Sequence, residues 1–218
     1  MKKLIFSFTM ARSKGFIIEK YGKEFWQFFH ALSKINFENT LSRTPDIGTS
    51  VFSFNYDFAP AYIAWYKSYI ALGLSQEETD EDIWKMNERM VTAIPKSFLH
   101  STGKAYMNGF RKKAAQHVER QNRGELHPFD WKIVSREIDN NTFEIDITEC
   151  AMKKLAHSLD ADGLLPGICR MDYLFSSVMG NGFTRTKTLG DGDECCNCHY
   201  ELEGSCEWAP EKGFNNRK

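Results

Sequence analysis

The residues of this chain that are best suited to chemistry lie in its last third. Five of the six cysteines fall between residues 143 and 200, and the sixth, Cys206, follows shortly after. The same stretch contains Asp172, Arg185 and His199. Thiols, carboxylates and a guanidinium near one another are the usual components of a polar site, because they transfer protons and bind anions. We therefore expect this region to carry the function.

Two cysteines have neighbours that suggest a chemical role. Cys150 follows the alternating segment FEIDITE and precedes a helical pattern. A thiol at a helix N-terminus is favoured as a nucleophilic thiolate, whereas a free cysteine is also commonly a small buried apolar residue. Cys169 and Asp172 lie three residues apart on a predicted helix and so share a face. That spacing places a carboxylate beside a thiol, or a core cysteine beside a surface aspartate.

Arg185 lies in an unusually polar segment, between Thr184 and Thr186. A buried arginine needs a carboxylate partner, which either the protein or a ligand supplies. Asp172 and Asp193 are the protein carboxylates that the sequence offers for this role. An internal ion pair and a substrate clamp are equally good interpretations.

The residues from Cys195 to His199 spell C-x-x-C-H, which attaches c-type haem in exported proteins. On a strand, however, Cys196 and Cys198 share one face while Cys195 points to the other. A structural zinc site normally uses two close-spaced ligand couples, and only one is clear here. We therefore predict no metal and no cofactor, with a zinc site as the minor alternative.

Composition limits the classes of partner. With 42% hydrophobic and 26% charged residues, the 218-residue chain is typical of a globular protein, and its formal charge of −1 argues against a nucleic-acid partner. No apolar run is long enough to span a membrane, so we expect no membrane partner. The apolar run LIFSFTM near the N-terminus is short and is followed by Arg12 and Lys14. It predicts a first helix or strand and not a signal peptide, hence a cytoplasmic protein with reduced thiols.

The first half of the chain shows the apolar spacing of helices. Ser75 and Glu78 form a capping box before one of them, and Pro60 suits the first turn of another. The polar segment 37–50 predicts a loop. The predicted helices cover 17–32, the part of the apolar segment 52–72 from about Pro60 to Leu72, the residues after Ser75, and 98–120.

The second half changes to strand patterns. It predicts hairpin strands at 131–138 and 143–148, helices at 149–158 and 164–178, and strands at 183–189 and 196–202. This order predicts an α+β fold, with a helical N-terminal half followed by a small antiparallel sheet that has helices packed on one face. We expect one domain over 1–203, mainly helical to 124 and then a sheet with two helices over 125–203. The tail 204–218 is expected to be flexible.

The order of the polar residues resembles the L-2-amino-thiazoline-4-carboxylic acid hydrolase family. That family shows a cysteine after a strand, then C-x-x-D, then R-x-x-T-L and finally G-D-x-x-C-D-F-R. Where the family has D-F-R, this chain has Asn197, Cys198 and His199. The G-D-x-x-C ending is also weakly similar to the 4-vinyl reductase type of small-molecule-binding domain. The residues that match the family pattern are Cys150, Cys169, Asp172, Arg185, Thr188, Leu189, Gly192, Asp193 and Cys196.

The resemblance implies hydrolytic opening of a small cyclic isothiourea, such as 2-amino-thiazoline-4-carboxylate, to N-carbamoyl-cysteine. From residue chemistry we expect Asp172 to act as the base, with Cys150, Cys169 or Cys196 as nucleophile or proton donor. Arg185 would bind the substrate carboxylate. Thr186, Asp193 and His199 complete the expected substrate-binding set.

Two rival functions use the same residues. One is a non-catalytic small-molecule or metal-binding module with the same cysteine-lined pocket. The other is a thiol redox protein, which ranks last because its C-x-x-C does not begin a helix. The expected partner is a small-molecule substrate, and the sequence leaves a homo-oligomer open.

Overall fold

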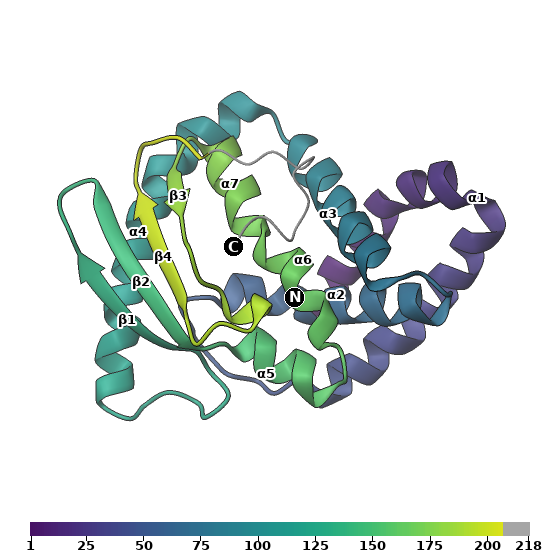
Figure 1. The fold of residues 1–218 in the computed structure, drawn as a ribbon, viewed down its shortest axis with the longest axis horizontal. Helices are drawn as coiled ribbons and strands as arrows, with labels where there is room; N and C mark the ends of the chain where they lie inside the picture. The colour runs from purple at the N-terminus through teal and green to yellow at the C-terminus, as the bar shows by residue number, and fades with distance from the viewer. Residues whose placement is uncertain (207–218) are drawn as a thin grey trace.

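The structure, a computed structural model, describes residues 1–206. Four long helices come first and a four-stranded antiparallel sheet follows, which confirms the α+β prediction. The sheet and α1 lie at opposite ends of the molecule (Figure 1). The helices are α1 (Lys2–Arg43), α2 (Ser53–Ala71), α3 (Gln76–Thr92), α4 (Lys96–Asn122), α5 (Ala151–Ser158), α6 (Leu165–Cys169) and α7 (Met171–Met179). The strands are β1 (Lys132–Glu137), β2 (Thr142–Glu149), β3 (Gly182–Thr184) and β4 (Cys196–Glu201).

Helix α1 is longer than the sequence predicted and is bent back on itself. It runs on to Arg43, so the predicted loop over 37–50 is wrong for its first part. The bend is at Gly22, whose φ of 90° suits glycine, the residue that adopts such a conformation without a Cβ clash. The two arms then pack side by side, with the rings of Phe6 and Phe37 stacked at 4.1 Å.

Helices α2 and α3 follow the sequence signals with one exception. Ser75 caps α3 in a complete capping box with Glu78, and Gly73, at φ 91°, ends the preceding helix. Pro60 is in the interior of α2 and not in its first turn as predicted. Proline costs the helix one backbone hydrogen bond. The helix nevertheless continues through Pro60, because the face of α2 that carries Tyr56 and Trp65 is buried in the core and its packing offsets this cost.

The sheet order is β1-β2-β4-β3, and every neighbouring pair is antiparallel. Alternate residues of β2 and β4 are buried, so one face is apolar and the other polar. Phe110 of α4 packs edge-on against Phe143 and Tyr200 from the apolar face. Tyr173 of α7 does the same against Phe183 of β3. The helices therefore cover one face, and we call this the inner face.

Two predicted elements are interrupted at the site described below. The helix predicted over 164–178 is divided into a 3-10 turn (Asp162–Leu164), α6 and α7. The strand predicted over 183–189 pairs with β4 only as far as Thr184, opposite His199. Beyond Thr184 the side chain of Asn197 replaces most of the backbone ladder, and its Oδ1 accepts from the amides of Thr186 and Lys187 at 3.0 and 2.7 Å.

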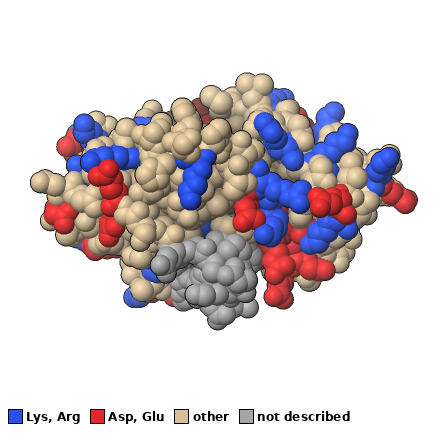
Figure 2. All heavy atoms as spheres, turned by 90° about the horizontal axis from the view of Figure 1, so that it is seen from above, with Lys and Arg blue, Asp and Glu red and all other residues tan. Residues whose placement is uncertain are grey.

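Surface properties match the balanced composition. On the face in Figure 2, Lys and Arg side chains are interspersed with Asp and Glu. Within residues 1–206, no helix combines the length and the apolar character that crossing a membrane requires. The predicted tail over 204–218 falls mostly outside the residues that the structure describes.

Candidate functional site

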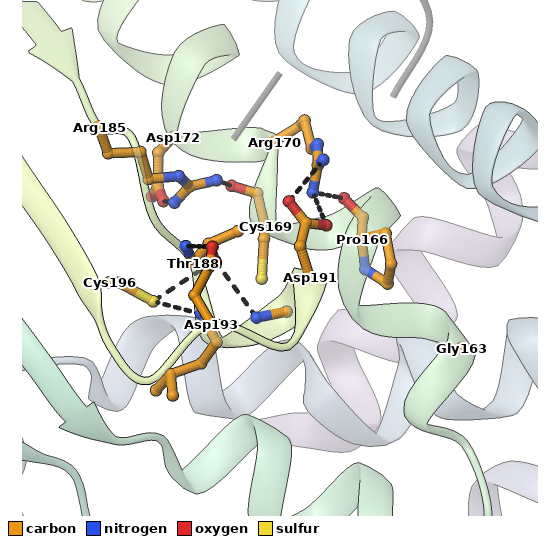
Figure 3. Close-up of polar contacts among 12 residues, drawn as sticks. Gly163, Pro166, Cys169, Arg170, Asp172, Arg185, Thr188, Asp191, Asp193 and Cys196 are labelled. Atoms are coloured by element: carbon orange, nitrogen blue, oxygen red, sulfur yellow. Dashed lines mark hydrogen bonds and ion pairs between the residues drawn. The ribbon is translucent and has the colours of Figure 1, made fainter. Parts of the chain in front are cut away.

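The centre of the candidate site is an ion pair beneath the sheet between Arg185 and Asp172. The Arg185 Nη1 donates to Asp172 Oδ2 at 2.8 Å, and Nη2 donates to the carbonyl of Cys169. The guanidinium carbon lies 5.5 Å from the Tyr173 ring centre and 5.4 Å from that of Phe183. Figure 3 shows the Arg185 side chain pointing toward Asp172. The break between α6 and α7 places the Cys169 carbonyl and Asp172 next to this guanidinium.

The electrostatics of the pair favour a charged guanidinium and a basic carboxylate. The Arg185 side chain is only 2% exposed, and its Nε has no hydrogen-bond partner among the described residues. Burial raises the pKa of Asp172, while the guanidinium opposes that shift. Asp172 nevertheless keeps 38% of its side-chain surface accessible. Solvent therefore reaches a carboxylate whose proton affinity is increased.

Three of the predicted thiols lie on the same side of the sheet as this pair. Arg185 interacts electrostatically with Cys169, Cys196 and Cys198, and Cys150 interacts with Cys196. Cys150 is the N-cap of α5, and Cys169 ends α6 next to Asp172. Burial raises the pKa of Cys150 to about 11 and that of Cys169 to about 12. Cys196 is buried on the inner face of β4. At neutral pH Cys150 and Cys169 are thus protonated thiols, so the helix terminus does not make Cys150 a thiolate.

Asp193 and Thr188 form the loop that holds Cys196. Asp193 Oδ2 accepts from the Thr188 amide at 2.8 Å, and the Asp193 amide returns a bond to the Thr188 carbonyl at 3.2 Å. The Cys196 thiol accepts from the Leu189 amide at 3.2 Å and lies 3.4 Å from Thr188 Oγ1. Figure 3 shows these contacts converging on the sulfur. In the structure Asp193 shapes the loop, and these bonds occupy one of its carboxylate oxygens.

Thr186 and His199 lie on the outer face of the sheet, away from the inner cluster. Both line a hollow of about 360 Å³. Its charged lining comes from neighbouring strands, where Arg136 bonds to Glu144 at 3.0 Å and to Asp146 at 2.7 Å. His199 Nδ1 is 3.3 Å from Glu144. Arg185 and Cys198 also contribute to the lining of this hollow. The predicted set is therefore divided, with Asp172, Cys150, Cys169 and Cys196 beneath the sheet, Thr186 and His199 above it, and Arg185 bound to Asp172 while it borders the hollow.

A second buried guanidinium was not identified from the sequence. Arg170, between α6 and α7, binds Asp191 with two bonds of 2.8 and 2.9 Å and also donates to the Pro166 carbonyl (Figure 3). Asp80 of α3 approaches the same region and is 6% exposed. Burial raises the pKa of Asp80 to about 7. Arg170 lies between Cys169 and Asp172 in the C-x-x-D motif, but no signal in the sequence distinguishes a buried arginine from an exposed one.

The described residues contain no group of three or more His, Cys, Asp or Glu side chains that could hold a metal ion. Cys198 faces the interior, whereas His199 faces outward on the same strand. The C-x-x-C-H string is thus divided between the two faces of the sheet, as its strand position predicted.

Comparison with known proteins gives one informative match. The model of the L-2-amino-thiazoline-4-carboxylic acid hydrolase family matches residues 57–200, which is more than half of the chain. A search of curated proteins finds no match. Among solved structures, the Fe(II) unliganded H-NOX protein from K. algicida aligns over 96% of this chain and all of its own, at 12% identity and a TM-score of 0.33. That similarity is too low to support an argument.

Proposed function

This chain belongs to the L-2-amino-thiazoline-4-carboxylic acid hydrolase family, and from that premise we propose that it hydrolyses a small cyclic isothiourea such as 2-amino-thiazoline-4-carboxylate. The observation that carries the proposal lies within the matched segment. There a partly accessible carboxylate, Asp172, is bound to a buried guanidinium, Arg185, beside the Cys169 thiol. Such a group can transfer a proton next to an anion-binding cation.

The chemistry requires one molecule of water. Asp172 takes a proton from water as its hydroxyl adds to the amidine carbon of the ring. The bond between this carbon and the ring sulfur then breaks, and the protonated Asp172 returns its proton to the departing sulfur. The proton that remains on the added hydroxyl moves to the former ring nitrogen as the carbonyl forms. The product is N-carbamoyl-cysteine, which is the substrate plus water. Burial raises the pKa of Asp172, and this direction favours both transfers, because a base and an acid work best when their pKa is close to the working pH.

Arg185 and the thiols have supporting roles in this proposal. The Nε of Arg185, which lacks a partner among residues 1–206, donates to the substrate carboxylate. Cys150 and Cys169 act as neutral hydrogen-bond donors toward the leaving sulfur, since burial keeps them protonated. A nucleophilic thiolate, the other role considered for them, would first have to overcome that burial.

The assay of the full chain with 2-amino-thiazoline-4-carboxylate tests the function directly. We expect turnover by the wild type and a loss of about 10²-fold or more in kcat for Asp172→Asn, because general acid–base catalysis typically contributes this much. Asp162→Asn is the matched control, since Asp162 is an exposed carboxylate that binds His157 and lies outside the cluster. An undiminished kcat in Asp172→Asn would contradict the assignment of Asp172 as the general base and acid.

A non-catalytic binding module is the rival function. The polar hollow on the outer face, with Thr186 and His199, favours it, because 360 Å³ is enough for a small molecule. Calorimetric binding of the same compound without turnover would support the module and contradict the hydrolase.

A further inference from the structure

Helix α1 exposes apolar side chains on the side that faces away from the core. Leu4 is 74% exposed, and Phe8, one turn later, is 54% exposed. On the second arm Phe28 and Ile35, two turns apart, are more than half exposed. Residues at these spacings lie on one face of a helix, so each arm presents an apolar stripe. We call these four residues the outer face of α1.

The core does not require these side chains. Phe6 and Met10 on the first arm, and Phe29 and Phe37 on the second, already supply the buried contacts. Each arm is thus apolar on two sides. A soluble helix normally has one apolar stripe, and a helix that is apolar on further sides is usually covered there as well.

The charge of α1 indicates what covers it. Of the 28 basic and 29 acidic residues in the chain, α1 contains eight and three, respectively. Its net charge is thus +5, while the rest of the chain carries −6. The first eighteen residues contain no acidic residue, and Arg12 and Lys14 are both exposed there. Arg12 lies 5.5 Å from the Phe8 ring, so a cation borders the apolar stripe directly.

The space between the two arms has the same character. A hollow of about 410 Å³ has Phe6, Met10 and Trp26 among its lining residues. Lys3 and Lys34 lie at the same hollow. Tryptophan is favoured where an apolar phase meets a polar one, because its ring is apolar and its N–H needs a partner.

A second copy of this chain, or a part in the family's own chemistry, explains these features less well than a lipid surface. A second copy docked through the same face would bring +5 against +5. The matched family segment begins at residue 57, so α1 lies outside the segment whose chemistry the family model describes. Basic side chains next to exposed Phe and Leu are the composition of helices that lie in a membrane interface.

We propose that α1 docks this protein on the surface of a bilayer that contains anionic phospholipids. The apolar side chains of the outer face enter the headgroup region, and the surrounding Lys and Arg side chains bind the lipid phosphates. The sequence predicted no membrane partner because it has no spanning segment, and docking through α1 needs none.

Co-sedimentation of the full chain with vesicles tests the proposal. We expect binding to vesicles of phosphatidylglycerol mixed with phosphatidylcholine, and weak or no binding to phosphatidylcholine alone. Binding should fall at least tenfold between 0.05 and 0.5 M salt, because salt screens the attraction between the basic side chains and the lipid phosphates. At the higher concentration the Debye length is shorter than about 5 Å.

Matched variants separate the two contributions. Leu4→Ser with Phe8→Ser, and Arg12→Glu with Lys14→Glu, should each weaken binding at least tenfold. Phe98→Ser, at an equally exposed phenylalanine of α4, and Lys112→Glu with Lys113→Glu, also on α4, should not. The proposal would be overturned if the wild-type protein did not bind anionic vesicles. It would also be overturned if sedimentation analysis showed a dimer that the Leu4→Ser, Phe8→Ser double variant dissociates, since a second copy would then occupy the outer face of α1.

Discussion

Arg185 keeps its charge beneath the sheet with an aspartate, a backbone carbonyl and two aromatic rings as neighbours. Taking a guanidinium out of water is costly unless its donors are satisfied, and Nε has no partner within the described part of the chain. A donor left in this state is compensated when an anion binds. At the scale of the residue, this is the reason to assign Arg185 to the substrate carboxylate.

Replacing Arg185 by Lys tests that assignment. The ammonium keeps the charge but loses the planar arrangement of donors, so it cannot bind Asp172, the Cys169 carbonyl and a substrate together. We expect KM to rise roughly tenfold or more, which corresponds to about 1.4 kcal/mol of binding, with a smaller change in kcat. Arg170→Lys is the control, because Arg170 is equally buried but is bound to Asp191. An unchanged KM would contradict the clamp.

The site could be predicted from residue types and spacing only in part. The order of Cys150, Cys169, Asp172 and Arg185 pointed to one region, and the structure places all four beneath the sheet. His199 could not be placed with them, because strand alternation turns it to the opposite face from Cys198. Arg170 was missed because sequence does not report burial.

At the scale of the element, α3 shows how local chemistry fixes a boundary. Ser75 Oγ accepts from the Glu78 amide at 3.2 Å, and the Glu78 carboxylate accepts from the Ser75 amide at 2.9 Å. These bonds satisfy amides that a helix start otherwise leaves open. The hydrogen bonds also lower the pKa of Glu78.

Ser75→Ala should reduce the free energy of unfolding by about 1 kcal/mol, the usual cost of losing an N-cap. Urea denaturation measures this change. Ser42→Ala is the control, because the Ser42 hydroxyl is exposed and only bonds back to the Asn39 carbonyl in the same helix. Equal stabilities of the two variants would show that the cap contributes nothing measurable.

Elements with a strong local signal could be read from the sequence, and elements set by tertiary contacts could not. The hairpin of β1 and β2 and the cap of α3 lie where their patterns predicted. The end of α1 did not, because its polar last turns are held by packing between the arms, with Phe37 stacked on Phe6. Strand β3 is short because Asn197, distant in sequence, binds the backbone after Thr184.

At the scale of the molecule, Asp80 lies in the core where α3 meets α6. Its Oδ1 has no hydrogen-bond partner among residues 1–206, and a Cβ on Gly167 would come within 2.9 Å of that oxygen. Burial raises the pKa of Asp80 to about 7. The folded protein therefore binds a proton that the unfolded chain, with an ordinary carboxyl pKa of about 4, releases.

This difference makes stability depend on pH in a defined direction. Between about pH 4 and 7 the folded state binds more protons, so the contribution of Asp80 to the free energy of unfolding falls as pH rises. Asp80→Asn should remove this dependence and stabilise the protein at pH 8 by roughly 2 to 4 kcal/mol. Thermal unfolding from pH 4.5 to 8 measures it. Glu81→Gln, at an exposed neighbour, should leave the profile unchanged, and a variant profile parallel to the wild type would contradict the prediction.

The side chain of Asn197 joins β4 to the segment that follows β3. Its amide nitrogen also donates to Thr186 Oγ1 at 2.8 Å, so both ends of the amide hold the segment after β3. A regular ladder is held by main-chain atoms that every residue shares. Here one backbone bond, from the Asn197 amide to the Lys187 carbonyl at 3.4 Å, is supplemented by the bonds of a single side chain. The segment directly after Arg185 is therefore held mainly by the side chain of position 197, which can vary while the register between β2 and β4 is fixed by main-chain pairing.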